Sequence, residues 1–295
     1  MKNIQLGIAP IGWSNDDMPD LGKENTFEQC ISEAALSGYS GTEIGSKFPA
    51  SVDEINRHLE LRNLKVASKW FGSHLCTQEY EKVEKEFEEE LKILKKLGSN
   101  RINVCEMSYC LFDTEKSMFT ENPHLNEEEW DKLTDGLDKL GALANTYDIS
   151  LCYHHHMATV VESIDETKRL LNSTDSDNVS LCYDTGHFAF AGEDPLEAAQ
   201  LFKNRTKHIH LKDIRKHKME QAIKDNFWFR KAVLENCFTI PGDGFIDFKD
   251  ILKVFSDNDY EGWLVVEAEQ VPQIHNPFEV AKRSYEYVTN IINEI

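Results

Sequence analysis

The chain has 295 residues, of which 40% are hydrophobic and 28% charged, a composition typical of soluble globular proteins. Its formal net charge of −20 disfavours nucleic acid as a partner, because such a surface repels phosphate backbones. No apolar stretch approaches the roughly 18 residues of a membrane span, and the first residues lack the apolar region of a signal peptide. We therefore expect a cytoplasmic protein that binds neither nucleic acid nor a membrane.

The seven cysteines point to the same compartment. They are scattered, odd in number and without the CxxC pairs of zinc sites, and several lie inside apolar runs. We expect reduced, buried thiols rather than disulfides, as is usual in the cytosol.

Short β-rich runs and amphipathic helical patterns alternate eight times along the chain. In chain order, the predicted strands are residues 4–9, 42–44, 66–71, 102–105, 149–153, 179–183, 208–211 and 263–266. The predicted helices are residues 27–35, 52–61, 80–94, 130–147, 164–171, 195–202, 248–255 and 278–292. Asn126 and Glu129 resemble a capping pair ahead of the fourth helix.

This alternation predicts an α/β fold with parallel strands and right-handed crossovers. Eight such units are what a single (β/α)8 TIM barrel needs. A doubly wound open sheet is the alternative, but no Gly-x-Gly-x-x-Gly turn follows the first strand. We expect residues 1–295 to form one domain, with a long loop at about 107–125 and an insert at about 214–241 at the barrel mouth.

Acidic and imidazole side chains gather at the ends of the late strands, where such barrels carry their chemistry. They are the run His154-His155-His156, the segment Asp184-Thr185-Gly186-His187, the residues His208, His210 and Lys212, and the pair Glu267 and Glu269. A turn-forming aspartate or a hydrogen-bonded core histidine would explain any one of them alone. Their arrival from different strands predicts one divalent-metal site.

Oxygen and imidazole ligands together suit Mn²⁺, Co²⁺, Fe²⁺ or Zn²⁺. A metal with open positions can bind a ketone oxygen and a neighbouring hydroxyl, and it stabilises the enediolate that forms when a base removes the α-proton. The site therefore predicts proton abstraction from a small-molecule polyhydroxy ketone, followed by isomerisation, epimerisation or loss of a β-hydroxyl. Trp13, Trp70, Phe71 and Phe112 lie at loop edges, where aromatic rings can stack against a sugar-like ring.

The opening segment, residues 7–19, resembles the opening signature of the inosose dehydratases, which are xylose-isomerase-like TIM barrels. The resemblance continues through residues 41–45, 153–157, 183–187, 210–213, 241–244 and 265–270, so it spans nearly the whole chain. The opening and closing segments are specific to the family, whereas the Asp-Thr-Gly-His segment is shared across the wider superfamily.

The resemblance implies metal-dependent dehydration of 2-keto-myo-inositol (scyllo-inosose) to a trihydroxycyclohexane-1,2-dione in inositol catabolism. It implies Mn²⁺ or Co²⁺ as the metal, and it associates glutathione with the activity. Carried over by strand, the superfamily's ligands on strands six to eight are Asp184, His210 and Glu267. The superfamily's usual glutamate on strand five is absent. Glu162 is the favoured fourth ligand, with His154 or His156 as the alternatives.

The remaining candidates fall into two groups. The base and the acid are sought among His156, His187, Lys212 and Glu269, whose roles the sequence does not separate. The candidate substrate-binding residues are Trp13, Glu43, Trp70 and His154. Lys212 serves better as electrostatic support than as a base, unless its pKa is lowered.

Three rival hypotheses remain. A sugar or cyclitol isomerase or epimerase would use the same metal site and differ in the fate of the enediolate. A non-catalytic sugar-binding barrel would not need the full ligand set. A DNA-repair nuclease of similar architecture is opposed by the net charge of −20. A homo-oligomer is compatible with the sequence, which does not show which outer helical faces are exposed.

Overall fold

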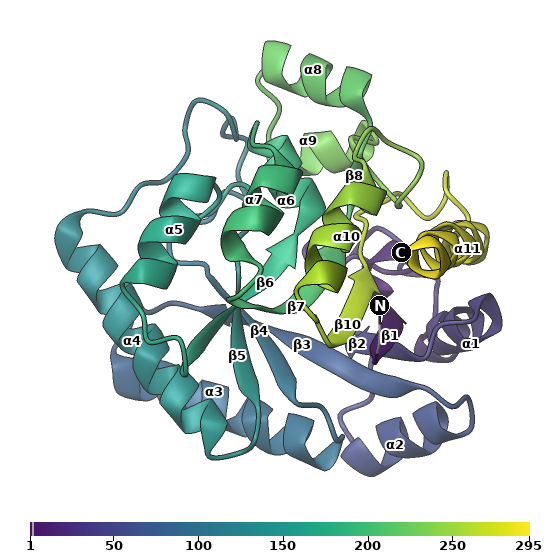
Figure 1. Cartoon of the computed structure of the whole chain (residues 1–295), viewed down its shortest axis with the longest axis horizontal. Coiled ribbons are helices and arrows are strands. Elements are labelled where there is room, and N and C mark those ends of the chain that lie inside the picture. The colour runs from purple at the N-terminus through teal and green to yellow at the C-terminus, as the bar shows by residue number, and fades with distance from the viewer. Residues whose placement is uncertain (2) are drawn as a thin grey trace.

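In the computed structural model, which describes residues 1 and 3–295, eight parallel strands close into a barrel in the order β1-β10-β7-β6-β5-β4-β3-β2 (Figure 1). They are β1 (Ile4–Ile8), β2 (Gly41–Ile44), β3 (Lys65–Ser73), β4 (Arg101–Glu106), β5 (Ser150–His154), β6 (Val179–Asp184), β7 (Thr206–Leu211) and β10 (Gly262–Val266). The predicted TIM barrel is confirmed, and each predicted strand corresponds to a barrel strand within a few residues.

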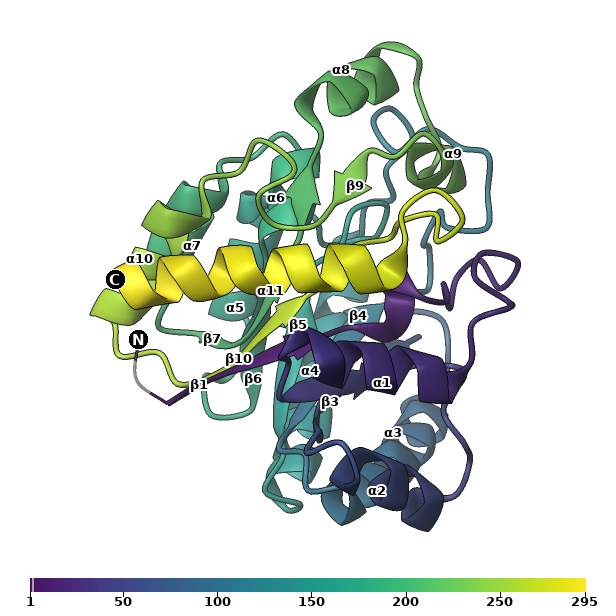
Figure 2. The ribbon, with the colours of Figure 1, turned by 90° about the vertical axis from the view of Figure 1, so that its right-hand side faces the viewer.

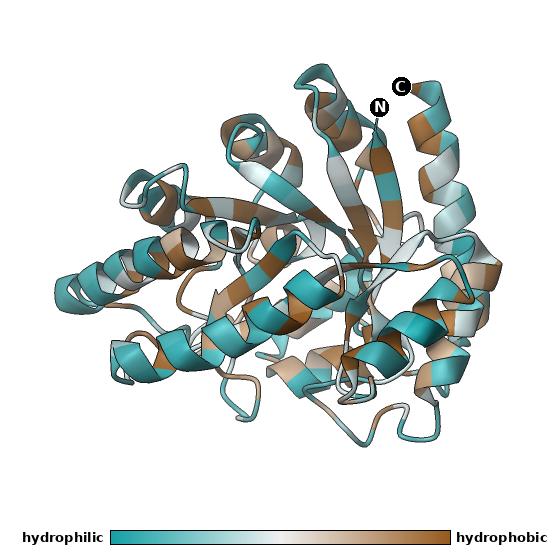
Figure 3. Cartoon of the chain, turned by 90° about the horizontal axis from the view of Figure 1, so that it is seen from below, coloured by the Kyte–Doolittle hydropathy of each residue, from teal (hydrophilic) through white to brown (hydrophobic). Residues whose placement is uncertain are grey.

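One main helix follows each barrel strand and covers the outside of the barrel. These helices are α1 (Phe27–Ser37), α2 (Val52–Glu60), α3 (Tyr80–Lys96), α4 (Glu127–Asn145), α5 (Ile164–Asn172), α7 (Pro195–Phe202), α10 (Phe248–Asp257) and α11 (Pro277–Glu294). Figure 3 shows the reason for this packing: the helices carry hydrophilic residues alongside hydrophobic stripes, whereas the strands are rich in hydrophobic residues. The predicted pair Asn126 and Glu129 forms a reciprocal capping box at α4.

Several short elements lie outside the predicted pattern. They are the 3-10 turn η1 (Pro10–Gly12), α6 (Thr185–Phe190), the strands β8 (Asp213–Ile214) and β9 (Phe238–Thr239), and the helices α8 (Lys216–Lys224) and α9 (Phe229–Leu234). The strands β8 and β9 pair with each other in antiparallel fashion. Figure 2 shows α8, α9 and β9 at the same end of the molecule, so the insert is structured.

The strand register sets the height of each polar side chain in the barrel. Asp184 at the end of β6 pairs with His210 on β7, and His210 pairs in turn with Val265 on β10. His154 at the end of β5 pairs with Cys182 on β6. The register therefore brings the polar ends of β5, β6, β7 and β10 to one level, although they come from distant parts of the sequence.

The long loop 107–125 and the insert meet each other. The backbone N–H of Met118 donates to the carbonyl of Phe227 at 3.2 Å. The rings of Phe112 and Phe229 stack with centroids 4.4 Å apart. Phe112 also lies 4.7 Å from the ring of His156, so this contact reaches the polar strand ends.

All seven cysteines are free thiols in the structure, and only Cys110 is not buried. Among the helices of residues 1 and 3–295, none combines the length and the apolar character needed to cross a membrane.

Candidate metal centre

Four buried side chains from four strand ends point one ligand atom each at a common point. They are His154, Asp184, His210 and Glu267, and their candidate ligand atoms all lie within 4.8 Å of one another. His154 Nε2 lies 3.6 Å from Asp184 Oδ2, and His210 Nδ1 lies 2.5 Å from Glu267 Oε2. The sequence predicts three of these four as ligands, but it favours Glu162 as the fourth and keeps His154 only as an alternative.

Most donor atoms of this centre have no other use in the fold. Both ring nitrogens of His154 and Asp184 Oδ2 are buried without a hydrogen-bond partner among residues 1 and 3–295, and His210 Nδ1 faces only another candidate ligand, Glu267 Oε2. Because leaving a buried polar atom unpaired costs about 1–3 kcal/mol, several such atoms around one point require a common partner. Two imidazoles and two carboxylates are a donor set that suits a divalent transition-metal ion.

The protonation of three of the four donors also fits a cation. Burial lowers the pKa of His154 well below its ordinary value, which keeps its imidazole neutral and able to ligate. Burial raises the pKa of Asp184 to about 6, although the ammonium of Lys212 opposes this rise. Burial alone would raise the pKa of Glu267 too, but Lys212 and His210 hold it well below its ordinary value. Both carboxylates are therefore available as anionic ligands at neutral pH. Burial alone would lower the pKa of His210, the fourth donor, but Cys182, Glu43 and Glu267 raise it above its ordinary value, so an ion that binds there displaces a proton from this imidazole.

A second layer of side chains orients His210. Glu43 Oε1 accepts hydrogen bonds from Nε2 of His208 and Nε2 of His210, both at 3.0 Å. The same oxygen accepts from Ser68 Oγ at 2.5 Å and from Asn103 Nδ2 at 3.0 Å. With Nε2 of His210 donating to Glu43, Nδ1 is left as the ligand atom, which is the usual arrangement around a metal-bound histidine. Glu43 therefore orients the ligand His210, and it also borders the cavity described below.

Glu162, the favoured fourth ligand, is not part of this group. One of its carboxylate oxygens accepts from the backbone N–H of Ala158 at 2.9 Å, and the other accepts from Asn122. It closes the turn that follows β5, and burial raises its pKa to about 8. The structure instead brings His154 to the centre, because β5 continues through His154 and directs that ring inward.

The three consecutive histidines have three different surroundings. The ring of His155 stacks on Phe188 with centroids 3.7 Å apart, and its Nε2 accepts from the backbone N–H of Asp184. His155 is therefore structural. His156 faces the cavity, and its Nδ1 lies 2.8 Å from the carbonyl oxygen of Met157. A carbonyl only accepts, so Nδ1 carries the proton and Nε2 has the free lone pair.

Lys212 lies beside the four donors and is fully buried. Its Nζ lies 2.8 Å from Glu267 Oε1, 2.7 Å from Glu269 Oε1 and 2.9 Å from His187 Nε2. Burial alone would lower the pKa of Lys212, but these carboxylates and Asp184 raise it above its ordinary value. Lys212 is thus an ammonium ion and not a base. Nε2 of His187 accepts a hydrogen bond from this ammonium, so that nitrogen is not free to take a proton from a substrate.

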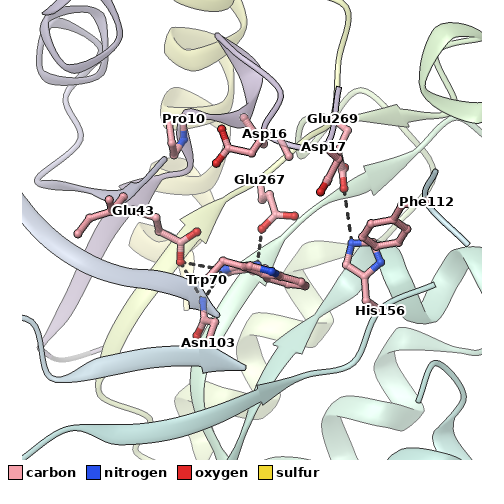
Figure 4. A pocket seen from close by; sticks show the side chains of 13 residues that line it. Pro10, Asp16, Asp17, Glu43, Trp70, Asn103, Phe112, His156, Glu267 and Glu269 are labelled. Carbon is pink, nitrogen blue, oxygen red and sulfur yellow. Dashed lines mark hydrogen bonds and ion pairs between the residues drawn. The ribbon is translucent and has the colours of Figure 1, made fainter. Parts of the chain in front are cut away.

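A cavity of about 100 Å³ opens onto the metal centre (Figure 4). Its lining comprises Pro10, Ile11, Asp16, Asp17, Glu43, Ile44, Trp70, Asn103, Phe112, His156, His210, Glu267 and Glu269. Figure 4 shows Glu267, Glu269 and His156 directed at the same space. Trp70 and Phe112 thus lie where a ring can stack against them.

Trp13 and Phe71 do not line this cavity. Trp13 is 1% exposed and packs in the core, where its indole N–H donates to Glu33 Oε2 at 2.5 Å. It follows the turn η1, which rotates its side chain away from the mouth. Phe71 packs against Phe87 of α3 outside the barrel, because it has the opposite strand parity to Trp70.

Sequence reasoning missed three polar residues of the cavity, Asp16, Asp17 and Asn103. Asp17 lies in the loop after β1 and borders the cavity; the residue as a whole is exposed, but desolvation of its carboxyl group at the cavity and then the charge of Glu269 raise its pKa to about 7. Asn103 stands in the middle of β4, between two apolar residues. An asparagine at an inward position of a barrel strand is the signal that would have revealed it.

Comparisons with known proteins identify the family of this chain. The family model described as "Xylose isomerase-like TIM barrel" matches residues 31–291. The inosose dehydratase of Clostridium perfringens (strain 13) is 49% identical over 293 residues, which cover 99% of each chain. The inosose dehydratase of Lacticaseibacillus casei is 45% identical over 291 residues, which cover 98% of each chain.

Solved structures show the same fold at much lower identity. The probable 3-DHS dehydratase AsbF from Bacillus anthracis has a TM-score of 0.71 and 16% identity, covering 97% of this chain and 98% of its own. The IOLI protein with a binding zinc atom has a TM-score of 0.70 and 15% identity, covering 98% and 97%. Because of its identity to these sequence relatives and its match to the family model, the chain belongs to the inosose dehydratase family of xylose isomerase-like TIM barrels.

Proposed function

We propose that this protein dehydrates inosose, namely scyllo-inosose, to a trihydroxycyclohexane-1,2-dione in inositol catabolism. The observation that carries the proposal is the convergence of His154, Asp184, His210 and Glu267 beneath a cavity that also holds a free imidazole nitrogen. Relatives named inosose dehydratase, at 45–49% identity over nearly the full length, support this substrate over others of the superfamily.

The four residues would hold one divalent ion, for which we propose Mn²⁺ or Co²⁺. When bound, such an ion supplies a Lewis acid that polarises the ketone and stabilises the negative charge that develops on its oxygen. Glu43, through Nε2 of His210, fixes the direction of one ligand. Trp70 and Phe112 border the space above it and exclude water from one face of the substrate ring.

We propose His156 as the base. Its free Nε2 faces the cavity, and its Nδ1 proton is held by the carbonyl of Met157. Burial lowers the pKa of His156 well below its ordinary value, so the imidazole is neutral before the reaction. It takes the proton from the carbon next to the ketone, and the electron pair of that C–H bond forms a carbon–carbon double bond.

We propose Asp17 as the acid. With a pKa of about 7, its carboxyl group retains a proton over part of the neutral range and can release it to the departing β-hydroxyl. The carbon–oxygen bond breaks, the hydroxyl leaves as water, and the resulting enol becomes the dione. Glu269 faces the same cavity with one oxygen bonded to Lys212, so it serves to accept a substrate hydroxyl rather than to deliver a proton.

Product analysis tests this proposal against the epimerase alternative. Purified protein is loaded with Mn²⁺ or Co²⁺ and incubated separately with scyllo-inosose and with a ketohexose, and the products are identified by mass and NMR. Dehydration predicts a dione that has lost one water from inosose. An interconverted ketohexose without water loss would favour an epimerase, and a metal-bound protein that changes neither compound would favour a sugar-binding barrel.

Two further features complete the proposal. The free, buried thiols support a reducing cytoplasmic location. We propose that glutathione supports activity without binding in the cavity. Most of the polar side chains that line the cavity already have proposed roles towards the metal ion or the substrate. Omitting glutathione from the metal-loaded assay is expected to leave the single-turnover rate unchanged.

A further inference from the structure

A second group of candidate ligands adjoins the four-residue centre. His156, His187 and Glu269 each offer one atom, and these atoms lie within 4.8 Å of one another. All three residues are buried, and Glu269 Oε2 and His187 Nδ1 have no hydrogen-bond partner among the described residues. By donor type this group resembles the first centre, and two such centres side by side are the arrangement of a two-metal enzyme.

The ammonium of Lys212 fills the space between the two groups. Its Nζ contacts Glu269 Oε1 at 2.7 Å and His187 Nε2 at 2.9 Å, which belong to the second group. It also contacts Glu267 Oε1 at 2.8 Å and lies 3.9 Å from Asp184 Oδ2, which belong to the first. The position has carboxylates and an imidazole around it, as a metal ion would have.

The backbone provides room for this lysine. A Cβ built on Gly186, at the start of α6, would lie 2.5 Å from Lys212 Cγ and 2.7 Å from its Cβ. Real Cβ contacts are never this short, so the glycine permits the lysine stem to pass beneath α6. The hydroxyl of Thr185 accepts from the backbone N–H of Lys212 at 2.9 Å and holds the same segment. These contacts fix the path of the lysine side chain and therefore the position of its ammonium group.

The charges of the site allow one divalent ion beside this ammonium. Asp184, Glu267 and Glu269 are the three buried carboxylates around Lys212, and one divalent ion together with the ammonium balances their charge; a fourth buried carboxylate, Glu43, is bonded to His208 and His210 instead. A second divalent ion would leave excess positive charge in a buried site, which is costly. We propose that Lys212 occupies a built second cation position, so that the enzyme binds one metal ion, and that removing the lysine side chain opens that position to a second ion.

This inference rests on the metal centre of the proposed function, and metal binding tests it without any substrate. The wild-type chain, Lys212→Ala and Lys207→Ala are stripped, incubated with excess Mn²⁺, gel-filtered and assayed for Mn²⁺ per chain. We expect one ion in the wild type and in Lys207→Ala, a control on the same strand, and two ions in Lys212→Ala. The double variant Lys212→Ala with Glu269→Gln is expected to return to one ion.

The spectrum of the bound Mn²⁺ gives a second readout. Ions held about 3.5–4 Å apart in a two-metal site couple magnetically, so Lys212→Ala should show a coupled pair by EPR and the wild type an isolated ion. Two ions in the wild type, or a single ion in folded Lys212→Ala, would overturn the inference and leave the metal centre standing. If Lys212→Ala does not fold, the number of Mn²⁺ ions per wild-type chain and their EPR spectrum still decide whether the inference holds. A wild type that binds no ion would overturn the metal centre and this inference together.

Discussion

At the scale of single residues, the chemistry depends on which nitrogen of an imidazole is free. His154 offers Nε2 to the metal centre, His155 uses Nε2 to hold the backbone of Asp184, and His156 keeps Nε2 free in the cavity. Neighbouring residues of one type thus take three roles, because alternation along β5 and the turn after it point them in different directions.

His156→Gln is expected to lower kcat by about 10²–10⁴-fold, the usual contribution of a general base. Exchange of the substrate α-proton with solvent deuterium should be lost as well, because this variant blocks the first step. Bound metal should be unchanged, as should the activity of the exposed control His124→Gln. If His156→Gln still exchanged the α-proton at the wild-type rate, another group would be the base.

Asp17→Asn should separate the second step from the first. We expect dione formation to fall by about 10²-fold or more while α-proton exchange continues, since the acid acts only on the departing hydroxyl. In the wild type, kcat should decline as the pH rises above about 7, where Asp17 loses its proton. The control is Asp113→Asn in the loop 107–125. Loss of exchange and dehydration together in Asp17→Asn would contradict the assignment.

Glu162 is expected to act on stability and not on metal binding. Its pKa rises from 4.5 to about 8 in the fold because of burial, so the folded chain holds a proton that the unfolded chain has released between these values. The stability from this proton is complete below about pH 4.5 and is lost as the pH rises towards 8.

Glu162→Gln removes this titration. Relative to the wild type, the variant should gain about 4 kcal/mol in the free energy of unfolding between pH 5 and pH 9, measured by urea denaturation. Asp165→Asn, an exposed carboxylate nearby, controls for a general charge effect. Loss of bound metal in Glu162→Gln would restore Glu162 as a ligand.

The sequence predicts much of the centre because a polar residue that ends an apolar strand needs a partner. This logic leads directly to Asp184, His210 and Glu267. It does not lead to the place of Glu162 or Trp13, since each follows a turn whose direction depends on tertiary contacts. Asp17 lies in an irregular loop without any periodic pattern, so its position over the cavity is not encoded locally.

At the scale of elements, the cavity is bordered by segments that follow different strands. The loop 107–125 supplies Phe112 to the lining, and α9 of the insert supports it through Phe229, whose ring stacks on that of Phe112. The exposed pair Asp20 and Arg230 joins the loop after β1 to α9 with contacts of 2.7 and 2.9 Å. Such a surface pair contributes little stability, about 0–1 kcal/mol, so the aromatic contact carries most of the packing.

Phe112→Ala tests this border. We expect KM for inosose to rise about 10-fold, because burying an aromatic ring is worth a few kcal/mol and part of that contact is made to the substrate. The matched control is Phe119→Ala, from the same loop, whose ring packs against Phe190 away from the cavity. Steady-state kinetics that change equally in both variants would show a general effect on the loop instead.

Periodicity predicts the eight strands and their main helices, since each is long enough to show an apolar face. It does not predict α6, α8, α9 or the ribbon β8–β9. α6 and α9 have six residues each and β8 and β9 two, which is too short for a periodic pattern; α8 has nine, but it buries Ala222 alone and so shows no apolar stripe. The need for a glycine at position 186 is explained only by the fold, because the aliphatic stem of Lys212 passes close to Gly186 at the start of α6.

At the scale of the whole molecule, closing the barrel is what assembles the centre. The ligands are contributed by β5, β6 and β7 and by the residue after β10, which lie next to one another in the closed sheet. An ion that binds only this folded arrangement must stabilise it, by about 2.7 kcal/mol at a free concentration one hundred times its Kd. Because the same four strand ends hold the ion that the reaction needs, the amount of bound metal and the rate of turnover should change together.

The most direct measurement is therefore the rate of dione formation from scyllo-inosose by the purified protein before EDTA treatment, after it, and after adding back Mn²⁺ or Co²⁺. We predict that stripping the ion abolishes dione formation and that either ion restores it in the wild type. In Glu267→Gln, activity should remain lost at the same ion concentration. Full dione formation by the stripped protein, or by metal-loaded Glu267→Gln, would contradict the metal centre described above.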